Sequence, residues 1–223
     1  MKYFSIAIDG PAGAGKSTIA KIIAKKLSFI YVDTGAMYRA MALYFIRNNI
    51  MADDKDKIEE ACNLVDISIE YMDGEQQIIL NGENVTGLIR TEEVGNMASA
   101  CSVYSKVRLK LVELQRSLAE KSNVVMDGRD IGTYVLPNAN LKIYLTASSK
   151  ERAKRRYLEL INKGISADID NIEKDIIDRD NRDMNREFAP LKQAEDAIVI
   201  DSSNMTIDEV ADSIIKYYEK SVK

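Results

Sequence analysis

The chain has 223 residues, a formal net charge of −4 and 46% hydrophobic residues, a composition typical of a globular protein with one main core. The negative net charge argues against sequence-independent nucleic-acid binding, which needs an excess of Lys and Arg. The absence of His excludes a His base and nearly every structural zinc pattern, and we expect the only two cysteines, Cys62 and Cys101, to be reduced, buried and without a function.

The start of the chain and its overall texture indicate one domain. Its first eight residues contain an apolar run that Asp9 interrupts, which is too short for a signal peptide or a membrane span. No internal repeat, low-complexity tract or Gly/Ser/Pro-rich linker divides the chain. We therefore expect a single cytoplasmic domain that acts as a monomer on small molecules, with no membrane or nucleic-acid partner.

The strongest local signal is Gly10–Ser17, which matches the G-x-x-x-x-G-K-[ST] pattern of phosphate-binding loops. A short apolar strand over 3–8 precedes it, and helical periodicity begins at Lys16, as the motif requires. In such a loop backbone N–H groups surround a phosphate, the lysine reaches the β- and γ-phosphates, and the hydroxyl of Ser17 can bind Mg²⁺. A plain glycine-rich turn is the alternative, but a turn needs neither the Lys–Ser pair nor the preceding strand.

A second strand over 29–32 completes the beginning of a β–α–β unit, so the pattern predicts a parallel sheet covered on both faces. Binding sites in such sheets lie beyond the carboxyl ends of the strands. The segment Asp33–Arg39 follows this strand and opens a helix that continues to Arg47, which makes it a candidate binding segment. Arg39 can bind a second phosphate there, although taken alone it is more typical of a solvent-exposed helix.

The next part of the chain predicts a small insertion. A charged helix is expected from Ala52 to Leu64, and short strands separated by turn signals follow it. The strands are expected over 66–71, 77–80 and 83–85, with turns at Asp73–Gly74 and Asn81–Gly82. Because antiparallel hairpins do not easily join a parallel sheet, they form the predicted insertion, and the next helix begins at Thr91 or Glu92.

A long amphipathic helix is predicted over 104–121, followed by a third core strand over 123–126. The helix is expected to bury Val107, Leu111, Leu114 and Leu118 and to carry Arg108, Gln115 and Arg116 on its other faces. The strand ends at Asp127–Thr133, which places two acids and one arginine between glycines at another carboxyl end. A charged turn with an internal Asp–Arg pair is the alternative interpretation of that segment.

Arginines recur on two adjacent helices predicted after a fourth strand over 141–145. Ser148 with Glu151 predicts a capping box for the first helix, and the second begins near Asp170, where Glu173 would complete another box. The arginines are Arg152, Arg155 and Arg156 on the first helix and Arg179, Arg182 and Arg186 on the second. Solvated, ion-paired helices are the alternative, since acids alternate with the second row, but the planar guanidinium fork suits phosphate oxygens. A fifth strand over 197–200 and a helix over 208–218 close the fold.

Four segments in this order together resemble the bacterial cytidylate kinase family: Gly10–Ser17, Asp33–Arg39, Asp127–Thr133 and Arg179–Arg186. The first is shared by all phosphate-loop proteins, whereas the combination of the other three is specific to this family, and the likeness spans nearly the whole chain. The resemblance implies an α/β nucleoside monophosphate kinase fold with a five-stranded parallel sheet, flanking helices, a small β-rich monophosphate-binding insertion and a helical lid. The implied parts are a core at about 1–50, 96–148 and 187–223, an insertion at about 60–95 and a lid at about 149–186.

The resemblance also implies the reaction and the site residues. ATP would give its γ-phosphate to CMP or dCMP, with Mg²⁺ bound by Ser17. The implied ATP-binding residues are Gly10, Pro11, Ala12, Gly13, Ala14, Gly15, Lys16, Ser17 and Thr18. The implied CMP-binding residues are Thr34, Arg39, Ser99, Arg108, Arg129, Asp130, Arg179, Asp183 and Arg186. The implied catalytic residues are Lys16, Arg129, Arg155 and Arg156, and Arg152, Arg155 and Arg156 are expected to close on the ATP phosphates.

The chemistry of cytosine agrees with the base-binding residues that the resemblance implies, Ser99, Arg108 and Asp130. Cytosine has an amine donor at N4 beside acceptors, which a carboxylate or hydroxyl and an arginine can match. Uracil would place a carbonyl against Asp130, so two acceptors would oppose each other. The alternatives are a kinase for another monophosphate such as UMP, or for a small alcohol, and a GTP-binding switch. The chain contains neither the D-x-x-G nor the N-K-x-D pattern expected of such a switch.

Overall fold

The computed structural model describes residues 3–72 and 75–222, which form two compact units. One unit consists of the chain up to Tyr31 together with the residues from Ser122 onward, and the other consists of Val32–Lys121. The first carries most of a five-stranded sheet and the second a three-stranded sheet. Within the described residues, none of the helices is both long enough and apolar enough to cross a membrane.

The five-stranded parallel sheet predicted from the alternation of strands and helices is confirmed. Its order is β2-β6-β1-β7-β8, and β1 pairs in parallel with both β6 and β7. The strands are β1 (Ser5–Asp9), β2 (Ile30–Asp33), β6 (Val124–Gly128), β7 (Leu141–Thr146) and β8 (Ile198–Asp201). Asp9 at the end of β1 lies opposite Gly128 at the end of β6. The phosphate loop and the Asp127–Thr133 segment therefore leave the sheet side by side.

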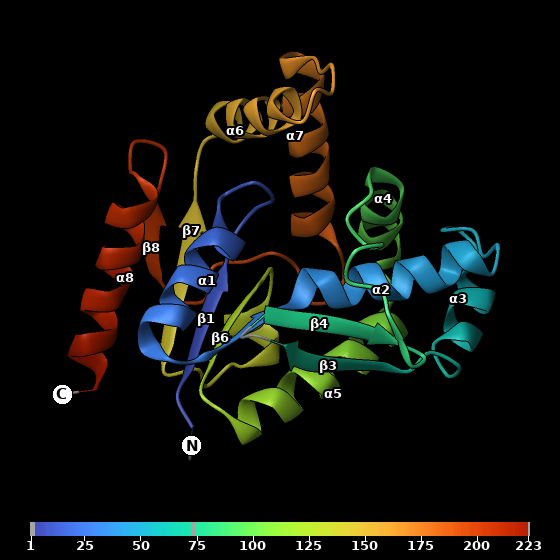
Figure 1. Ribbon diagram of the computed structural model, residues 1–223, viewed down its shortest axis with the longest axis horizontal. Helices are drawn as coiled ribbons and strands as arrows, with labels where there is room; N and C mark the ends of the chain where they lie inside the picture. Colours follow the sequence, from blue (N-terminus) through green and yellow to red (C-terminus); the bar gives the residue numbers. More distant parts are fainter. Residues whose placement is uncertain (1–2, 73–74, 223) are drawn as a thin grey trace. The chain divides into compact units, whose positions relative to one another are not determined.

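Two helices, α1 (Lys16–Leu27) and α8 (Ile207–Ser221), pack against the strands of this sheet (Figure 1). Their buried residues, which include Ile19, Ile23, Val210 and Ile214, join apolar residues of the strands in one hydrophobic cluster. Burial of each such aliphatic side chain stabilises the fold by about 1.5–3 kcal/mol. This packing holds the phosphate loop between a buried strand and a buried helix.

Helices α6 (Ser149–Asn162) and α7 (Ile169–Asn185) lie side by side in the same unit (Figure 1). The Ser148 hydroxyl caps α6 by accepting a hydrogen bond from the N–H of Glu151 at 3.2 Å, but the predicted capping box is only half formed, because the N–H of Ser148 donates to the Ser203 hydroxyl. The predicted capping box at Asp170 is wrong, because the carboxylate of Asp168 accepts from the first N–H groups of α7. Glu173 is thereby left to accept a tertiary hydrogen bond from the Ser149 hydroxyl at 2.6 Å.

The second unit contains the predicted antiparallel hairpins. Its strands are β3 (Ile67–Met72), β4 (Glu75–Leu80) and β5 (Glu83–Asn84), paired in that order. Asn81 and Gly82 both have positive φ, 48° and 84°, as a tight two-residue hairpin turn requires. The other predicted turn, Asp73–Gly74, lies outside the described residues.

Four helices surround these hairpins within the second unit. They are α2 (Thr34–Arg47), α3 (Lys55–Ala61), α4 (Glu92–Cys101) and α5 (Ser105–Lys121). The charged helix expected from Ala52 is shorter than predicted, because the Asp54 carboxylate caps it by accepting from the N–H of Lys57. Cys62 and Cys101 are both free and buried, as expected.

The buried face of α5 differs from the prediction. Leu114 and Leu118 are only partly buried, whereas Arg108 and Gln115 are each 1% exposed. The Arg108 guanidinium donates to the carbonyl of Ser102 at 3.2 Å and lies over the ring of Tyr38, 5.4 Å from its centroid. Hydrophobic periodicity cannot reveal such a position, because an arginine is buried only where tertiary contacts satisfy its N–H groups.

Candidate functional site

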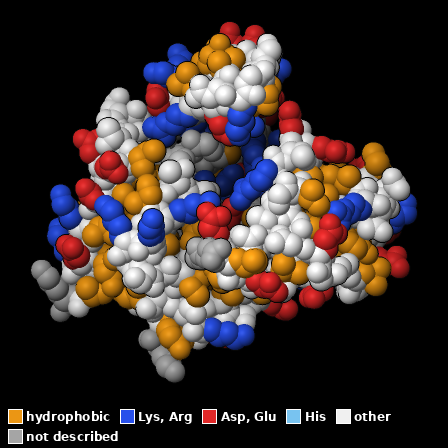
Figure 2. Space-filling model, viewed as in Figure 1, with side chains coloured by type: hydrophobic (Ala, Val, Ile, Leu, Met, Phe, Trp, Pro, Cys, Tyr) orange, Lys and Arg blue, Asp and Glu red, His pale blue; other side chains and the backbone are white. Residues whose placement is uncertain are grey.

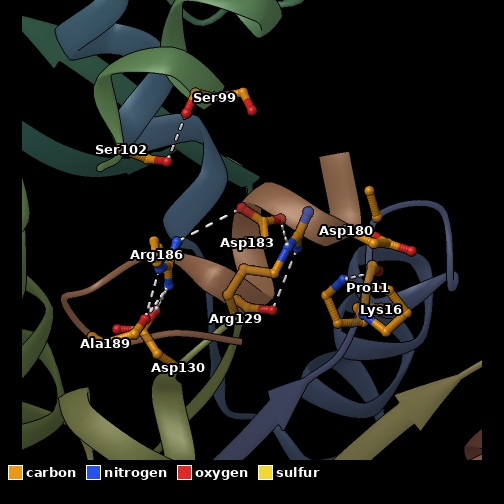
Figure 3. Close-up of polar contacts among 12 residues, drawn as sticks. Pro11, Lys16, Ser99, Ser102, Arg129, Asp130, Asp180, Asp183, Arg186 and Ala189 are labelled. Carbon is orange, nitrogen blue, oxygen red and sulfur yellow. Dashed lines mark hydrogen bonds and ion pairs between the residues drawn. The ribbon is translucent and has the colours of Figure 1, made fainter. Parts of the chain in front are cut away.

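The phosphate loop joins β1 to α1 in the conformation that its glycines allow. A Cβ atom on Gly10 would lie 1.9 Å from the carbonyl oxygen of Leu145, so only glycine fits where β7 passes. Gly15 has a φ of 87° and caps α1 in the left-handed region. Lys16 turns back into its own loop, where its Nζ donates to the carbonyl of Pro11 at 2.7 Å (Figure 3). The free loop is thus already folded around its lysine.

Burial changes the ionisation of two charged groups at this loop. Burial, followed by the charge of Arg129, lowers the pKa of Lys16 to about 7, against the effect of nearby carboxylates. Burial also raises the pKa of Asp9 to about 7, although Asp9 accepts two backbone hydrogen bonds that oppose this shift. A perturbed lysine at the start of a helix is a group whose charge an arriving anion can restore.

Asp127, at the end of strand β6, links two hydroxyl groups beside the loop. The Ser17 hydroxyl donates to its Oδ2 at 2.8 Å, and the Tyr31 hydroxyl donates to its Oδ1 at 2.9 Å. A hydroxyl and a carboxylate are the oxygen ligands that Mg²⁺ prefers when phosphates supply the rest of its shell. Within the described residues no group of three or more acids, Cys or His could hold a metal by itself. The Ser17–Asp127 pair therefore fits a metal that arrives with a nucleotide.

Four residues predicted to bind the acceptor form one cluster in the first unit, in which Arg129 is partly buried and the other three are buried (Figure 3). Arg129 Nε donates to Asp183 Oδ2 at 2.8 Å. An Nη atom of Arg186 lies 3.7 Å from Asp183 Oδ1, and its other Nη donates to Asp130 Oδ1 at 3.3 Å. Arg186 Nε also donates to the carbonyl of Ala189 at 2.7 Å. The cluster joins the segment after β6 to the last turn of α7.

The charges of this cluster keep one another ionised. Burial lowers the pKa of Arg129, but Asp183, together with Asp180 and Asp127, more than compensates, so the net shift is upward. Burial likewise raises the pKa of Asp183, yet the surrounding arginines hold it below its ordinary value. Those arginines are Arg129, Arg179 and Arg186. Three guanidinium groups around one carboxylate leave positive charge that suits a phosphate.

The three arginines of α6 have separate partners, although Lys and Arg side chains gather around α6 and α7 in Figure 2. Arg152 is 6% exposed and forms an ion pair with Asp180 at 2.7 Å. Arg155 donates to the carbonyl of Ser202 at 2.6 Å, in the loop after β8. Arg156 is half-exposed and pairs with Glu159. Helical spacing alone does not bring these guanidinium groups together.

Arg39, in the second turn of α2, is held by backbone oxygens of its own unit. One Nη atom lies 3.1 Å from the carbonyl of Ile89 and 3.3 Å from that of Thr91. The same atom lies 2.9 Å from where a Cβ atom on Gly95 would be. Glycine at this position of α4 therefore makes room for the guanidinium, and a larger residue would displace it.

Ser99 and Arg108, the two residues of this unit that are predicted to bind the base, lie around the end of α4. Ser99 is 8% exposed, and its hydroxyl has no hydrogen-bond partner among the described residues. The carbonyl of Ser99 accepts from the Ser102 hydroxyl at 2.8 Å (Figure 3). The carbonyl of Ser102 accepts in turn from Arg108. A buried hydroxyl without a partner is available to a ligand.

The predicted site residues are thus divided between the two units. The first unit holds the phosphate loop with Arg129, Asp130, Arg179, Asp183 and Arg186, and the second holds Thr34, Arg39, Ser99 and Arg108. The sequence analysis missed Asp9, Tyr31, Gly95 and Asp127. Asp127 carried a usable signal, since it ends a strand of the sheet that carries the phosphate loop. Gly95 carried none, because its role depends on the place of Arg39.

Comparisons with known sequences agree with one another. The model of the family described as Cytidylate kinase matches residues 6–220. A protein of Caldicellulosiruptor bescii named cytidylate kinase is 54% identical over 223 residues, which cover 100% of this chain and 99% of that one. One of Bacillus subtilis with the same name is 48% identical over 219 residues, 98% of each chain.

Solved structures with a similar fold include two shikimate kinases. The one from Bacteroides thetaiotaomicron has a TM-score of 0.51 at 13% identity and covers 97% of this chain and 98% of that one. The one from Acinetobacter baumannii, in complex with shikimate, has a TM-score of 0.50 at 15% identity, covering 98% and 94%. At such low identity the likeness concerns the fold alone, an α/β fold that kinases use.

Proposed function

The chain belongs to the cytidylate kinase family, and we propose that it transfers the γ-phosphate of ATP to CMP or dCMP, giving ADP and CDP or dCDP. The observation that carries this proposal is the cluster of Arg129, Asp130, Asp183 and Arg186, of which Arg129 and Asp183 act on the pKa of Lys16 in the phosphate loop. A phosphate loop needs one lysine for its own nucleotide. Further fixed arginines can bind the phosphate of a second substrate.

We assign the two substrates to different groups of residues. The loop Gly10–Thr18 binds ATP, with Lys16 neutralising charge on the transferred group. The CMP phosphate and sugar take Thr34, Arg39, Arg129, Arg179, Asp183 and Arg186, and the base takes Ser99, Arg108 and Asp130. Asp183 is the residue that a phosphate would partly replace as partner of Arg129, since both prefer the same guanidinium fork.

Catalysis in this scheme is alignment and charge neutralisation, because phosphoryl transfer leaves the protein little covalent chemistry. Lys16 and Arg129 follow the carboxyl ends of the paired strands β1 and β6, which is where we assign the phosphates of the two substrates. Arg155 and Arg156 of α6 are assigned to the ATP phosphates. The assignment of Arg155 is supported by the position of one of its Nη atoms, which lies 3.9 Å from where a Cβ atom on Gly15 would be. Arg156 forms an exposed ion pair with Glu159, which costs little to break when Arg156 turns to the phosphates.

Mg²⁺ is the cofactor that the family and the donor set imply. Ser17 and Asp127 would hold it, directly or through water, with the phosphates of ATP. When bound, the ion neutralises phosphate charge. The hydrogen bond from Tyr31 keeps Asp127 oriented toward Ser17. We further propose that the protein works as a monomer in cytoplasmic pyrimidine metabolism, and light scattering after size-exclusion chromatography measures the first of these claims.

The acceptor profile tests this function. Coupled assays of ADP release with CMP, dCMP, UMP, AMP and shikimate as acceptors should give the highest kcat/KM with CMP or dCMP. Best turnover with UMP or AMP would replace the assignment by another monophosphate kinase. Turnover of shikimate alone would contradict the proposed role of the arginine cluster, because this alcohol has no phosphate for these arginines to bind.

ATP binding is expected to take up as much as one proton above pH 7. The pKa of Lys16 is about 7 in the free protein, and a bound phosphate favours its charged form and raises that pKa. Binding therefore takes up a proton wherever the pH exceeds the free pKa, and ATP affinity falls as the pH rises from about 7 to 9. Calorimetry at about pH 8 in buffers of different ionisation enthalpy measures the uptake.

The control for this prediction is Lys16→Arg. An arginine stays protonated at this pH, so the Lys16→Arg variant should take up fewer protons on ATP binding than the unaltered protein. Asp9, whose pKa is also about 7, is present in both proteins, and the difference isolates Lys16. Equal proton uptake by the two proteins would contradict the prediction.

Gly95→Ala is expected to weaken CMP use without weakening the fold. The new Cβ atom would lie 2.9 Å from an Nη atom of Arg39 and would move this flexible guanidinium. Alanine also stabilises a helix relative to glycine by about 1 kcal/mol. We expect kcat/KM for CMP to fall about ten- to a hundredfold, as for a misplacement of about 1 Å. Thermal unfolding should show an unchanged or higher Tm, and an equal loss in KM for ATP would speak against this explanation.

A further inference from the structure

Asp9, the last residue of β1, is a buried carboxylate that no step above uses. It directly precedes Gly10 of the phosphate loop and is 5% exposed. Its Oδ1 accepts a hydrogen bond from the N–H of Ile131 and its Oδ2 one from the N–H of Gly132, both at 2.7 Å. One side chain of the central strand therefore holds the backbone of the segment that follows β6.

The two N–H groups begin a short π-helical turn, η1 (Ile131–Val135). The carbonyl of Asp130 accepts from the N–H groups of Tyr134 and Val135, at 2.8 and 3.1 Å, so Asp130 stands at the capping position. An aspartate there ordinarily uses its own carboxylate to accept from the first N–H groups of the turn. Asp130 makes no such bond, and its Oδ1 instead accepts from Arg186.

The fit around this turn is close. A Cβ atom on Gly132 would lie 3.3 Å from Asp9 Oδ2 and 3.1 Å from Cδ of Lys142. Lys142 is itself held, since its Nζ donates to the carbonyl of Pro137 at 2.6 Å and to Asp196 at 2.8 Å. Neither Asp9 nor the turn can shift far without breaking these contacts.

We propose that Asp9 is a positioning residue for recognition of the acceptor base: it caps the turn after Asp130 from the neighbouring strand, so that the Asp130 carboxylate stays out of the turn and keeps the orientation in which it pairs with Arg186. This inference rests on the proposed assignment of Asp130 to cytosine. It also joins the two halves of the reaction, because the residue that holds the acceptor segment is the one that leads into the ATP loop.

Asp9→Asn tests the proposal. Its amide keeps the size of the carboxylate but offers one acceptor, and its NH₂ group faces the second N–H donor. With one N–H of the turn unsatisfied, Asp130 is expected to turn inward and cap it. The ratio of kcat/KM for CMP to that for UMP should then fall at least tenfold. An unchanged ratio in a folded Asp9→Asn protein would overturn the proposal.

A double-mutant cycle with Asp130→Asn separates this proposal from the one on which it rests. If Asp9 acts through Asp130, the double variant should lose no more discrimination than Asp130→Asn alone. Additive losses would show that Asp9 acts by another route and would reject the inference. If Asp130→Asn keeps full discrimination, the assignment of Asp130 fails instead, whatever Asp9→Asn does.

Asp168→Asn is the matched control, because this exposed carboxylate also accepts two backbone N–H bonds, at the start of α7. It should leave the CMP-to-UMP ratio unchanged. A measurement on the unaltered protein covers the case in which Asp9→Asn does not fold. Amide hydrogen exchange at Ile131 and Gly132 should be slow without any nucleotide. Fast exchange at both would show that Asp9 does not hold the turn, which would also overturn the proposal.

Discussion

Replacing Arg129 by alanine is expected to lower kcat/KM for CMP by about a thousandfold or more, while the Kd of ATP changes little. Arg129 is partly buried and is held in its charged form by Asp183, so in the proposed site it would present a fixed fork to the phosphates. An arginine in such a position contributes about 10³ to 10⁵ in rate. Steady-state kinetics with varied CMP and calorimetry with ATP alone measure the two quantities.

Two further variants separate the chemical role of Arg129 from its structural one. The alanine variant leaves the buried Asp183 with a weaker partner, Arg186 at 3.7 Å, so part of its loss reflects stability. Arg129→Lys keeps the charge but not the planar fork, and it should restore Tm without restoring the rate. Arg182 lies on the exposed side of α7, so Arg182→Ala is the control and should change neither the Tm nor the rate. A lysine variant with full activity would reduce the role of Arg129 to charge alone.

Arg152→Met is expected to lower the free energy of unfolding by about 3–5 kcal/mol, the cost of leaving a buried charge without its partner. The side chain of Arg152 donates to the carbonyl oxygens of Ala147 and Ala12, each at 2.9 Å, and pairs with Asp180. The other carboxylate oxygen of Asp180 is buried without a hydrogen-bond partner among the described residues. Urea unfolding, followed by circular dichroism, measures the loss.

The same helix provides the control for this prediction. Arg156 forms an exposed pair with Glu159, and Arg156→Met should cost at most about 1 kcal/mol. The double variant Arg152→Met, Asp180→Leu should recover most of the stability, because it removes both buried charges. If Arg152→Met cost no more than Arg156→Met, the Arg152–Asp180 pair would have to be accessible to water. Because Arg152 bonds the phosphate loop at Ala12, the single variant should also weaken ATP binding.

The local elements of the fold could be predicted from sequence because their causes are local. Apolar runs and turn residues predict the five core strands, and the helices between them predict that the sheet is parallel. The antiparallel strands of the second unit were predicted from the turn signals at Asp73–Gly74 and Asn81–Gly82. The capping residues were harder to predict: α7 begins at Ile169, close to the predicted start, but Asp168 rather than Asp170 caps it, because several acids there compete for the same N–H groups.

Burial of charged residues could not be predicted. Arg108, Arg152 and Asp183 all lie at positions that periodicity assigns to solvent, and each is buried because a partner distant in the sequence satisfies its charge or its N–H groups. The three arginines of α6 share one face by spacing, yet tertiary contacts send them to different partners. Which arginines surround a common point is a property of the packed elements rather than of one helix.

The sequence by itself determined the phosphate loop, the strand and helix around it and the family, because these depend on residues that are neighbours in the chain. Only the tertiary structure decided that Asp9 caps the turn at Ile131 and Gly132 and that Ser17 and Tyr31 share Asp127. The physical reason is the register of β1 against β6, which brings residues more than a hundred positions apart within 3 Å. Hydrogen bonds depend on that distance, and no local pattern in the chain records it.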